Sequence, residues 1–267
     1  MRPYLAAFRI RFLHSLQYRA AALAGLMTQF AWGFMQLLAF QAFYRADPAA
    51  FPMTFQQIAS YIWLQQAFLA LFMTWFYEND IFEAITSGGV AYELSRPMDL
   101  YGRWFVQSTA NRLAKAALRF APVLVVAVLL PAPLGLQPPA GGLHLLLFLL
   151  SMGLGLCVVV AFTMLIYISC FFTLSVVGIR IMAAALVDFM AGAVVPLPFF
   201  PPAFRAVAEL LPFAAMQNLP LRIYSGQLTG AAMWQGMGLQ VFWLGALVLL
   251  GRLWMHRALQ RVVVQGG

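Results

Sequence analysis

Long, unbroken apolar runs dominate this sequence and limit the folds open to it. The stretch 143–169, for example, contains no Asp, Glu, Lys or Arg. Of the 267 residues, 63% are hydrophobic and 9% are charged, whereas a soluble domain is about 25% charged. Lipid must therefore solvate much of the chain. Because a backbone in lipid must satisfy its own hydrogen bonds, and because the runs do not alternate, the sequence predicts an all-α integral membrane protein.

The number of apolar runs predicts how often the chain crosses the bilayer. A transmembrane helix needs about 20 apolar residues, and one transmembrane domain over residues 1–267 has room for six such helices with short loops. The predicted spans are 20–44, 55–77, 119–136, 143–174, 176–200 and 233–254.

Residues 1–19 precede the first span and are predicted to form an amphipathic helix on the membrane surface. Leu5, Phe8, Phe12 and Leu16 recur at spacings of three or four, which gives a helix one apolar face. On this reading Arg11 lies on the opposite side of the helix.

Prolines interrupt the segment 196–220, just before the last predicted span. They are Pro196, Pro198, Pro201, Pro202, Pro212 and Pro220. We expect a broken re-entrant hairpin on the outer side, with a short helical piece from Ala203 to Leu211. A broken helix at membrane depth is tolerated only where it packs against protein or lines water.

The positions of the basic residues predict the orientation of the chain. With the N-terminus inside, thirteen of the sixteen Lys and Arg residues fall on the inner side, and only Arg45, Arg205 and Arg222 fall outside. Both termini are therefore predicted to be cytoplasmic. The charge of +8 is spread along one membrane face, so we expect no nucleic-acid partner. Lys115 is the only lysine, which hints at a GC-rich bacterial genome.

Several chemical motifs are absent from the sequence. The surroundings of Lys115 lack the glycine-rich turn of a phosphate-binding P-loop, and neither HExxH nor GxSxG occurs. Cys157 and Cys170 lie in one apolar run and the three histidines are scattered, so we expect neither a metal site nor a cofactor in this chain. The sequence therefore predicts a protein that is not an enzyme.

The segment 78–111, between the second and third spans, is predicted to be a cytosolic coupling loop. It begins with a short helix in which acidic residues surround an apolar knob, and two glycines end that helix. Such a helix suits docking into a groove of a partner protein, although a solvated loop helix is the plainer alternative. The residues assigned to the contact are Glu78, Asp80, Ile81, Phe82, Glu83, Ile85, Gly88 and Gly89.

Four stretches carry a resemblance to a known family. They are 85–97 (ITSGGVAYELSRP), 196–202 (PLPFFPP) with 211–213 (LPF), 220–226 (PLRIYSG) and the terminal 265–267 (QGG). In this order they resemble the small six-span permeases of bacterial type-2 ABC exporters. The resemblance implies a separate cytosolic ATPase dimer that binds ATP and Mg²⁺, a second copy or a sister permease, a coupling helix after span two, and a bacterial inner-membrane location.

Polar residues inside the predicted spans are candidates for a translocation path. They are Gln29, Gln36, Gln65 and Asp188. A charge at the depth of Asp188 is costly and marks function by default, but a structural, protonated or paired Asp is an equal alternative. The glutamines are as well explained by hydrogen bonds between helices.

Two other functions remain open from the sequence. One is a proton-coupled secondary transporter that uses Asp188, although such proteins usually show repeated halves and several intramembrane charges. The other is a membrane assembly factor that transports nothing. For a transporter, the broad apolar walls favour a lipid-like, amphipathic or peptide substrate over an inorganic ion.

Overall fold

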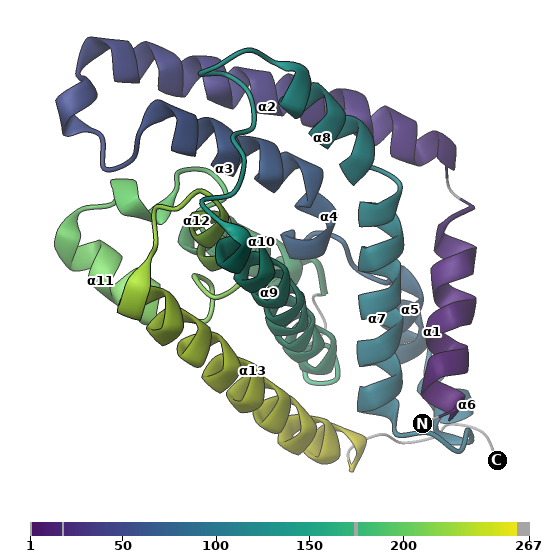
Figure 1. The fold of residues 1–267 in the computed structure, drawn as a ribbon. Helices are drawn as coiled ribbons and strands as arrows, with labels where there is room; N and C mark the ends of the chain where they lie inside the picture. Colours follow the sequence, from purple (N-terminus) through teal and green to yellow (C-terminus); the bar gives the residue numbers. More distant parts are fainter. Residues whose placement is uncertain (1, 18, 174–175, 261–267) are drawn as a thin grey trace.

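The computed structural model describes residues 2–17, 19–173 and 176–260. Over these ranges the chain is built from helices and contains no β-strand (Figure 1), so the predicted all-α fold is confirmed. The α-helices are α1 (Arg2–Ser15), α2 (Arg19–Ala46), α3 (Phe55–Ala67), α4 (Leu69–Phe72), α5 (Asn79–Thr86), α6 (Val90–Leu94), α7 (Leu100–Ala117), α8 (Phe120–Leu129), α9 (Gly142–Ser169), α10 (Val176–Met190), α11 (Pro202–Leu210), α12 (Asn218–Tyr224) and α13 (Gly230–Leu259).

In the described part of the chain, three helices are long and apolar enough to cross a membrane. They cover Ala22–Ala46 in α2, Gly142–Ser169 in α9 and Gly230–Leu259 in α13, with 25, 28 and 30 residues. At about 1.5 Å per residue, each exceeds the hydrocarbon thickness of about 30 Å. Three of the six predicted spans are therefore matched by single helices of spanning length.

The other three predicted spans are shorter or broken. The predicted span 55–77 is divided between α3 and α4, which end at Ala67 and Phe72. Helix α8 has 10 residues, roughly 15 Å, and it ends before Pro131, which cannot continue a helix. Helix α10 has 15 residues. The six-span count therefore does not follow from helix lengths alone.

Helix α9 lies at the centre of the fold and packs against α13, α12 and α7 (Figure 1). The run Val158, Val159, Val160 and Ala161 is completely buried although its side chains point in all directions, as expected for a helix surrounded by others. Helices α2, α3 and α8 form a second packed layer around Ile58 and Trp63.

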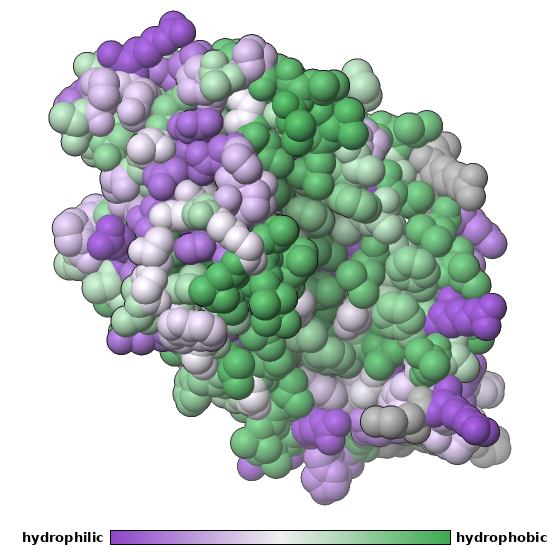
Figure 2. Space-filling model, viewed as in Figure 1, coloured by the Kyte–Doolittle hydropathy of each residue, from purple (hydrophilic) through white to green (hydrophobic). Residues whose placement is uncertain are grey.

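Apolar side chains also cover much of the outer surface. Figure 2 shows a broad hydrophobic area between hydrophilic groups that gather at the upper left and along the lower right edge. On α13 the exposed residues include Phe242, Leu249, Leu250 and Leu253. Exposed apolar area of this extent suits contact with lipid tails.

Helix α1 forms as predicted, but its orientation differs from the expectation. It packs against α7, and Arg11 points inward, where it forms ion pairs with Glu78 and Asp80. Leu5 is 70% exposed. The expectation that Arg11 lies on the far side was wrong, because an ion pair with a residue 67 positions away, and not the apolar spacing, selects the packed face.

The predicted loop 78–111 is also more ordered than expected. After α5 and α6 it enters α7, an 18-residue helix that begins at Leu100 with the side chain of Asp99 as its N-cap. Figure 1 places α6 near the start of α1 and the end of α13, at one end of the molecule. Helix α11 lies at the opposite end.

In the proline-rich segment, α11 matches the predicted helical piece. The buried helix α12 follows it and packs on α9 and α3. The re-entrant depth of this hairpin stays a prediction. The terminal motif at 265–267 lies outside the described residues.

Candidate functional site: a half-open cavity and the α5–α6 segment

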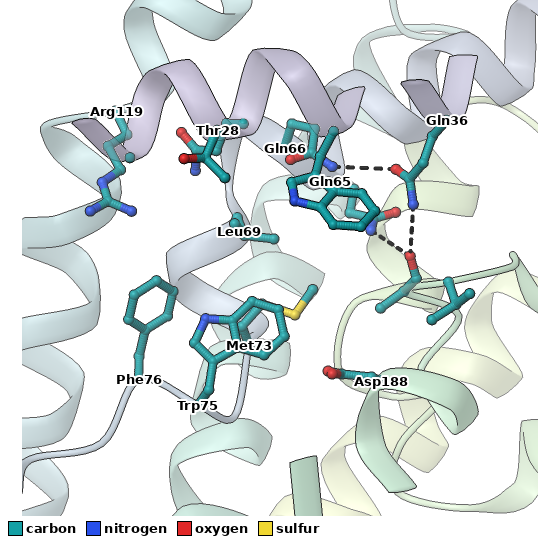
Figure 3. A pocket seen from close by; sticks show the side chains of 15 residues that line it. Thr28, Gln36, Gln65, Gln66, Leu69, Met73, Trp75, Phe76, Arg119 and Asp188 are labelled. Carbon is teal, nitrogen blue, oxygen red and sulfur yellow. Dashed lines mark hydrogen bonds between the residues drawn. The ribbon is translucent and has the colours of Figure 1, made fainter. Parts of the chain in front are cut away.

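A cavity of about 480 Å³ lies between α2, α3, α4 and α10 (Figure 3). All four polar residues that the sequence singled out line it, namely Gln29, Gln36, Gln65 and Asp188. They come from α2, α3 and α10, the last of which is distant in the sequence from the other two. The fold therefore gathers the predicted path residues at one place, although their role in translocation stays a prediction.

Two of these glutamines hold the chain turn after α10. The side-chain amides of Gln36 and Gln65 donate to the carbonyl of Ala193, at 3.3 and 2.7 Å (Figure 3). Gln66 donates to the side-chain oxygen of Gln36 at 3.3 Å, and Tyr61 donates to the carbonyl of Gly192 at 3.0 Å. The plainer alternative, hydrogen bonding between helices, thus accounts for Gln36 and Gln65.

Gln29 behaves differently. Its side chain is 2% exposed, it lines the cavity, and neither its oxygen nor its nitrogen has a hydrogen-bond partner among the described residues. A buried amide without a partner is costly. This side chain is therefore available to a polar group that enters the cavity.

Asp188 is half-buried on α10 and points into the cavity (Figure 3). One of its carboxylate oxygens is buried without a hydrogen-bond partner, and no ion pair joins the residue to another in the described part of the chain. The paired-Asp alternative therefore finds no partner among the described residues.

The cavity also contains a cation that the sequence did not single out. Arg119 lies between α7 and α8, and its guanidinium faces the cavity (Figure 3). The sequence treated it only as an inner-side charge at the start of a span. Its position beside an apolar run was the available signal, but only the fold brings it next to Gly25 of α2.

The α5–α6 segment shows where the predicted coupling residues lie. Ile81 and Phe82 are 3% and 6% exposed, so the expectation of a protruding apolar knob was wrong. The ring of Phe82 packs against Tyr167 with centroids 4.9 Å apart, and the guanidinium of Arg180 lies 5.0 Å from it. The hydrophobic face of the short helix is buried against its own domain, not left for a partner.

Glu78 is also withdrawn from the surface. It is 3% exposed, its carboxylate accepts hydrogen bonds from Arg11 and Asn111, and its backbone N–H donates to the hydroxyl of Tyr167 at 2.7 Å. The acidic rim is thereby reduced to Asp80, which pairs with Arg11 at 3.1 Å but stays largely exposed, and Glu83.

The outer face of the segment remains open to a partner. Glu83 and Gly88 are exposed, while Ile85 and Gly89 are partly exposed. Gly88 has a φ of +76°, which favours glycine and makes the predicted turn between α5 and α6. The side chain of Tyr92 on α6, which the sequence-based assignment does not include, is 82% exposed.

A buried arginine fixes the chain that connects the cavity to this segment. Arg112 on α7 donates to the carbonyls of Ala70, Leu71 and Met73 at 3.4, 3.3 and 2.7 Å. These carbonyls lie at the end of α4 or just beyond it, where helical partners are missing. Arg112 therefore stabilises the exit of the chain from α4.

A second hollow of about 450 Å³ lies between α1, α5 and α7 and shares Arg119 with the first. Lys115 lines it. Burial, together with the neighbouring guanidinium groups of Arg112, Arg119 and Arg11, lowers the pKa of Lys115 to about 8. Positive charge is thus concentrated along this side of α7. Among the described residues, no group of three His, Cys, Asp or Glu could hold a metal ion.

Comparison with models of known protein families identifies a match that covers most of the chain. A family model described as "ABC-2 family transporter protein" matches residues 30–266. The matched region includes the α5–α6 segment, Arg119 and Asp188, while Gly25 and Gln29 precede it. The comparison with curated proteins returned no match.

Proposed function

Because the chain belongs to the ABC-2 family of transporter proteins, we propose that it is the permease subunit of an ATP-binding cassette exporter, driven by a separate ATPase. The observation that carries this proposal is the family match over nearly the whole chain. The given sequence contains no P-loop pattern, which supports a separate ATP-binding subunit as the source of the energy for transport.

The proposed location is the cytoplasmic membrane of a bacterium, with both termini in the cytosol. The distribution of Lys and Arg supports this orientation. The start of α1, the α5–α6 segment and the end of α13 lie at one end of the molecule (Figure 1), which agrees with a common cytosolic side. In this topology α3–α4, α8 and α10 join the three long helices as shorter or broken spans.

A second permease, identical or related, would complete the translocation path. The cavity is partly open, and the large apolar side chain of Trp32, which lines it, is 55% exposed. A path through the membrane requires walls around its whole circumference. A partner subunit facing α2 and α10 would supply the missing wall.

The exposed face of the α5–α6 segment is the proposed contact with the ATPase. Because Phe82 lies beneath this face and packs with Arg180 of α10, a displacement of the segment would reach the helix that carries Asp188. The proposed contact residues are Glu83 and Tyr92, because Ile81 and Phe82 are buried.

The test is co-purification from the native membrane in mild detergent, followed by reconstitution and measurement of ATP-driven export. We expect an ATPase with a P-loop in the purified complex. A Glu83→Lys, Tyr92→Ala double variant should lower ATPase association about tenfold or more while the permease stays folded. Leu249→Ala, on the exposed apolar surface of α13, is the matched control. Purification of a folded permease without any ATPase would contradict the proposal.

The unpaired carboxylate of Asp188 favours one second candidate, a proton-coupled transporter. The same vesicles distinguish the two: transport driven by a proton gradient without ATP, and abolished by Asp188→Asn, would favour the second. Transport that requires ATP favours the first.

A further inference from the structure

Arg119 is a cation that the fold brings to the cavity without a counterion. Among the described residues its side chain forms no ion pair and no hydrogen bond, and its Nε is buried without an acceptor. The two acids of the neighbouring hollow, Glu78 and Asp80, are already paired with Arg11. Asp188 lines the same cavity from another wall (Figure 3), but no ion pair connects it to Arg119.

The two charged groups of the cavity, Asp188 and Arg119, differ in how their charge can be neutralised. A half-buried carboxyl such as Asp188 can become neutral by binding a proton, whereas a guanidinium stays charged at any physiological pH. The ring of Phe76, whose centroid lies 5.8 Å from the guanidinium carbon of Arg119, gives this partly buried cation a cation–π contact. No described carboxylate pairs with Arg119, so an anion from outside the chain would neutralise its charge. Lys115 lies 5.1 Å from the centroid of the same ring, and its charge interacts with that of Arg119, so a second positive charge lies close to this side of the cavity.

The rest of the cavity wall is mostly apolar. Leu69, Met73, Trp75 and Phe76 line it on the side of α4 and the chain that follows, and Trp32 lines it on α2. A volume of about 480 Å³ falls in the range of small-molecule sites. Beyond the apolar part, Gln29 offers an amide without a partner. The site thus combines one cation, an apolar wall, one free amide and, on another wall, the carboxyl group of Asp188.

We propose that this cavity binds an amphiphile whose anionic head, a phosphate or a carboxylate, pairs with Arg119, and whose apolar body lies against Trp32, Met73 and Trp75. Arginine suits such a head because its parallel N–H groups bind two oxygens at once. This ligand class rests on the proposed transport function and specifies the substrate for it. The head could belong to a membrane lipid or to a smaller exported amphiphile, since both present the same chemistry.

Gly25 gives the arginine its position. A methyl group at Gly25 would meet the guanidinium carbon of Arg119 at 2.7 Å and its two terminal nitrogens at 2.8 and 2.9 Å. The absence of a side chain on α2 therefore leaves the space in which the guanidinium lies. Gly25→Ala should displace the head-binding group while keeping its charge, because the end of a long side chain moves more easily than a helix.

The test measures binding by the purified permease in phosphatidylcholine nanodiscs, with neither ATPase nor ATP present. Lipids with brominated chains quench nearby tryptophans, and Trp32 and Trp75 line the cavity. We expect brominated phosphatidylglycerol to quench more strongly than brominated phosphatidylcholine at equal fraction. Arg119→Gln should lower the apparent affinity for the anionic lipid about tenfold, and Arg119→Lys and Gly25→Ala should lower it less.

Soluble competitors separate the two sources of the anionic head. If decyl phosphate relieves the quenching, the site is open to small amphiphiles. If the quenching depends on Arg119 and decyl phosphate does not relieve it, the ligand is a membrane lipid. Either result supports the anionic ligand class. Arg45→Gln, at an exposed position outside the cavity, should change nothing.

The ligand class is refuted if decyl trimethylammonium competes better than decyl phosphate, if both head groups quench equally, or if Arg119→Gln leaves the affinity unchanged. Because no ATPase takes part in the assay, such a result leaves the transport role to be decided by co-purification.

Discussion

Replacing Glu78 by glutamine tests whether the buried ion pair fixes α1 and the α5–α6 segment to α7. The carboxylate receives Arg11 on one oxygen and Asn111 on the other, and the oxygen of Asn111 accepts from Ser15 at 3.1 Å. In Glu78→Gln, the new amide nitrogen replaces one of the two oxygens. It therefore faces a donor, either Arg11 or Asn111, whichever position it takes. The change therefore removes a charge and at least one hydrogen bond without changing the shape of the side chain.

The magnitude follows from burial. Breaking a fully buried ion pair costs about 3–5 kcal/mol, but Arg11 keeps 23% of its side chain exposed and retains Asp80 at 3.1 Å. We therefore expect Glu78→Gln to lower the free energy of unfolding by about 2–3 kcal/mol, which lowers the apparent melting temperature on the order of 5 °C or more. Cys157 and Cys170 are free, and Cys170 is buried, so a thiol-reactive dye can follow thermal unfolding.

The matched control is Asp80→Asn, which alters the exposed half of the same network and should cost about 1 kcal/mol or less. A double-mutant cycle with Arg11→Gln then isolates the pair, since contacting residues give non-additive effects. Strictly additive effects of Glu78→Gln and Arg11→Gln, or a cost for Asp80→Asn equal to that of Glu78→Gln, would refute the reasoning.

Two further predictions concern packing and pH. Gly155→Ala should prevent normal assembly, because the added methyl group would lie 2.3 Å from the carbonyl oxygen of Met216. The control, Gly153→Ala, should melt like the wild type, because its methyl group meets nothing within 4 Å. Equal melting of the two variants would contradict the packing of α9. The lowered pKa of Lys115 means that the folded state loses its proton near pH 8 while the unfolded chain keeps it to about pH 10.4. The free energy of unfolding of the wild type should therefore rise between these pH values relative to that of Lys115→Met. Melting curves of the two proteins recorded from pH 7 to 10 test this. A melting temperature that depends on pH in the same way in both proteins would contradict the pKa shift.

Much of the fold follows from the sequence by itself. The long apolar runs determine α2, α9 and α13, because a backbone in lipid must close its hydrogen bonds within each helix. Prolines end α8 before Pro131 and set off α11 in the segment before the last span. These features depend on residues that are close along the chain, and they also carry the family resemblance that the match over residues 30–266 confirms.

The path residues show what a pattern of polar side chains can and cannot determine. The sequence marks Gln29, Gln36, Gln65 and Asp188 because polar groups are costly in a membrane span, and the fold places all four around one cavity. The sequence does not distinguish Gln36 and Gln65, which bind the carbonyl of Ala193, from Gln29, whose amide has no described partner.

Only the tertiary structure decides which face of each short helix is buried. Arg11 points inward because it forms an ion pair with the buried Glu78. Phe82 is buried because Tyr167 and Arg180 pack against its ring. Arg119 becomes a cavity residue because Gly25 of α2 leaves space for its guanidinium. Each of these contacts joins residues more than 60 positions apart. Helical spacing describes what a helix can present, whereas the partner on the next helix decides which side is used.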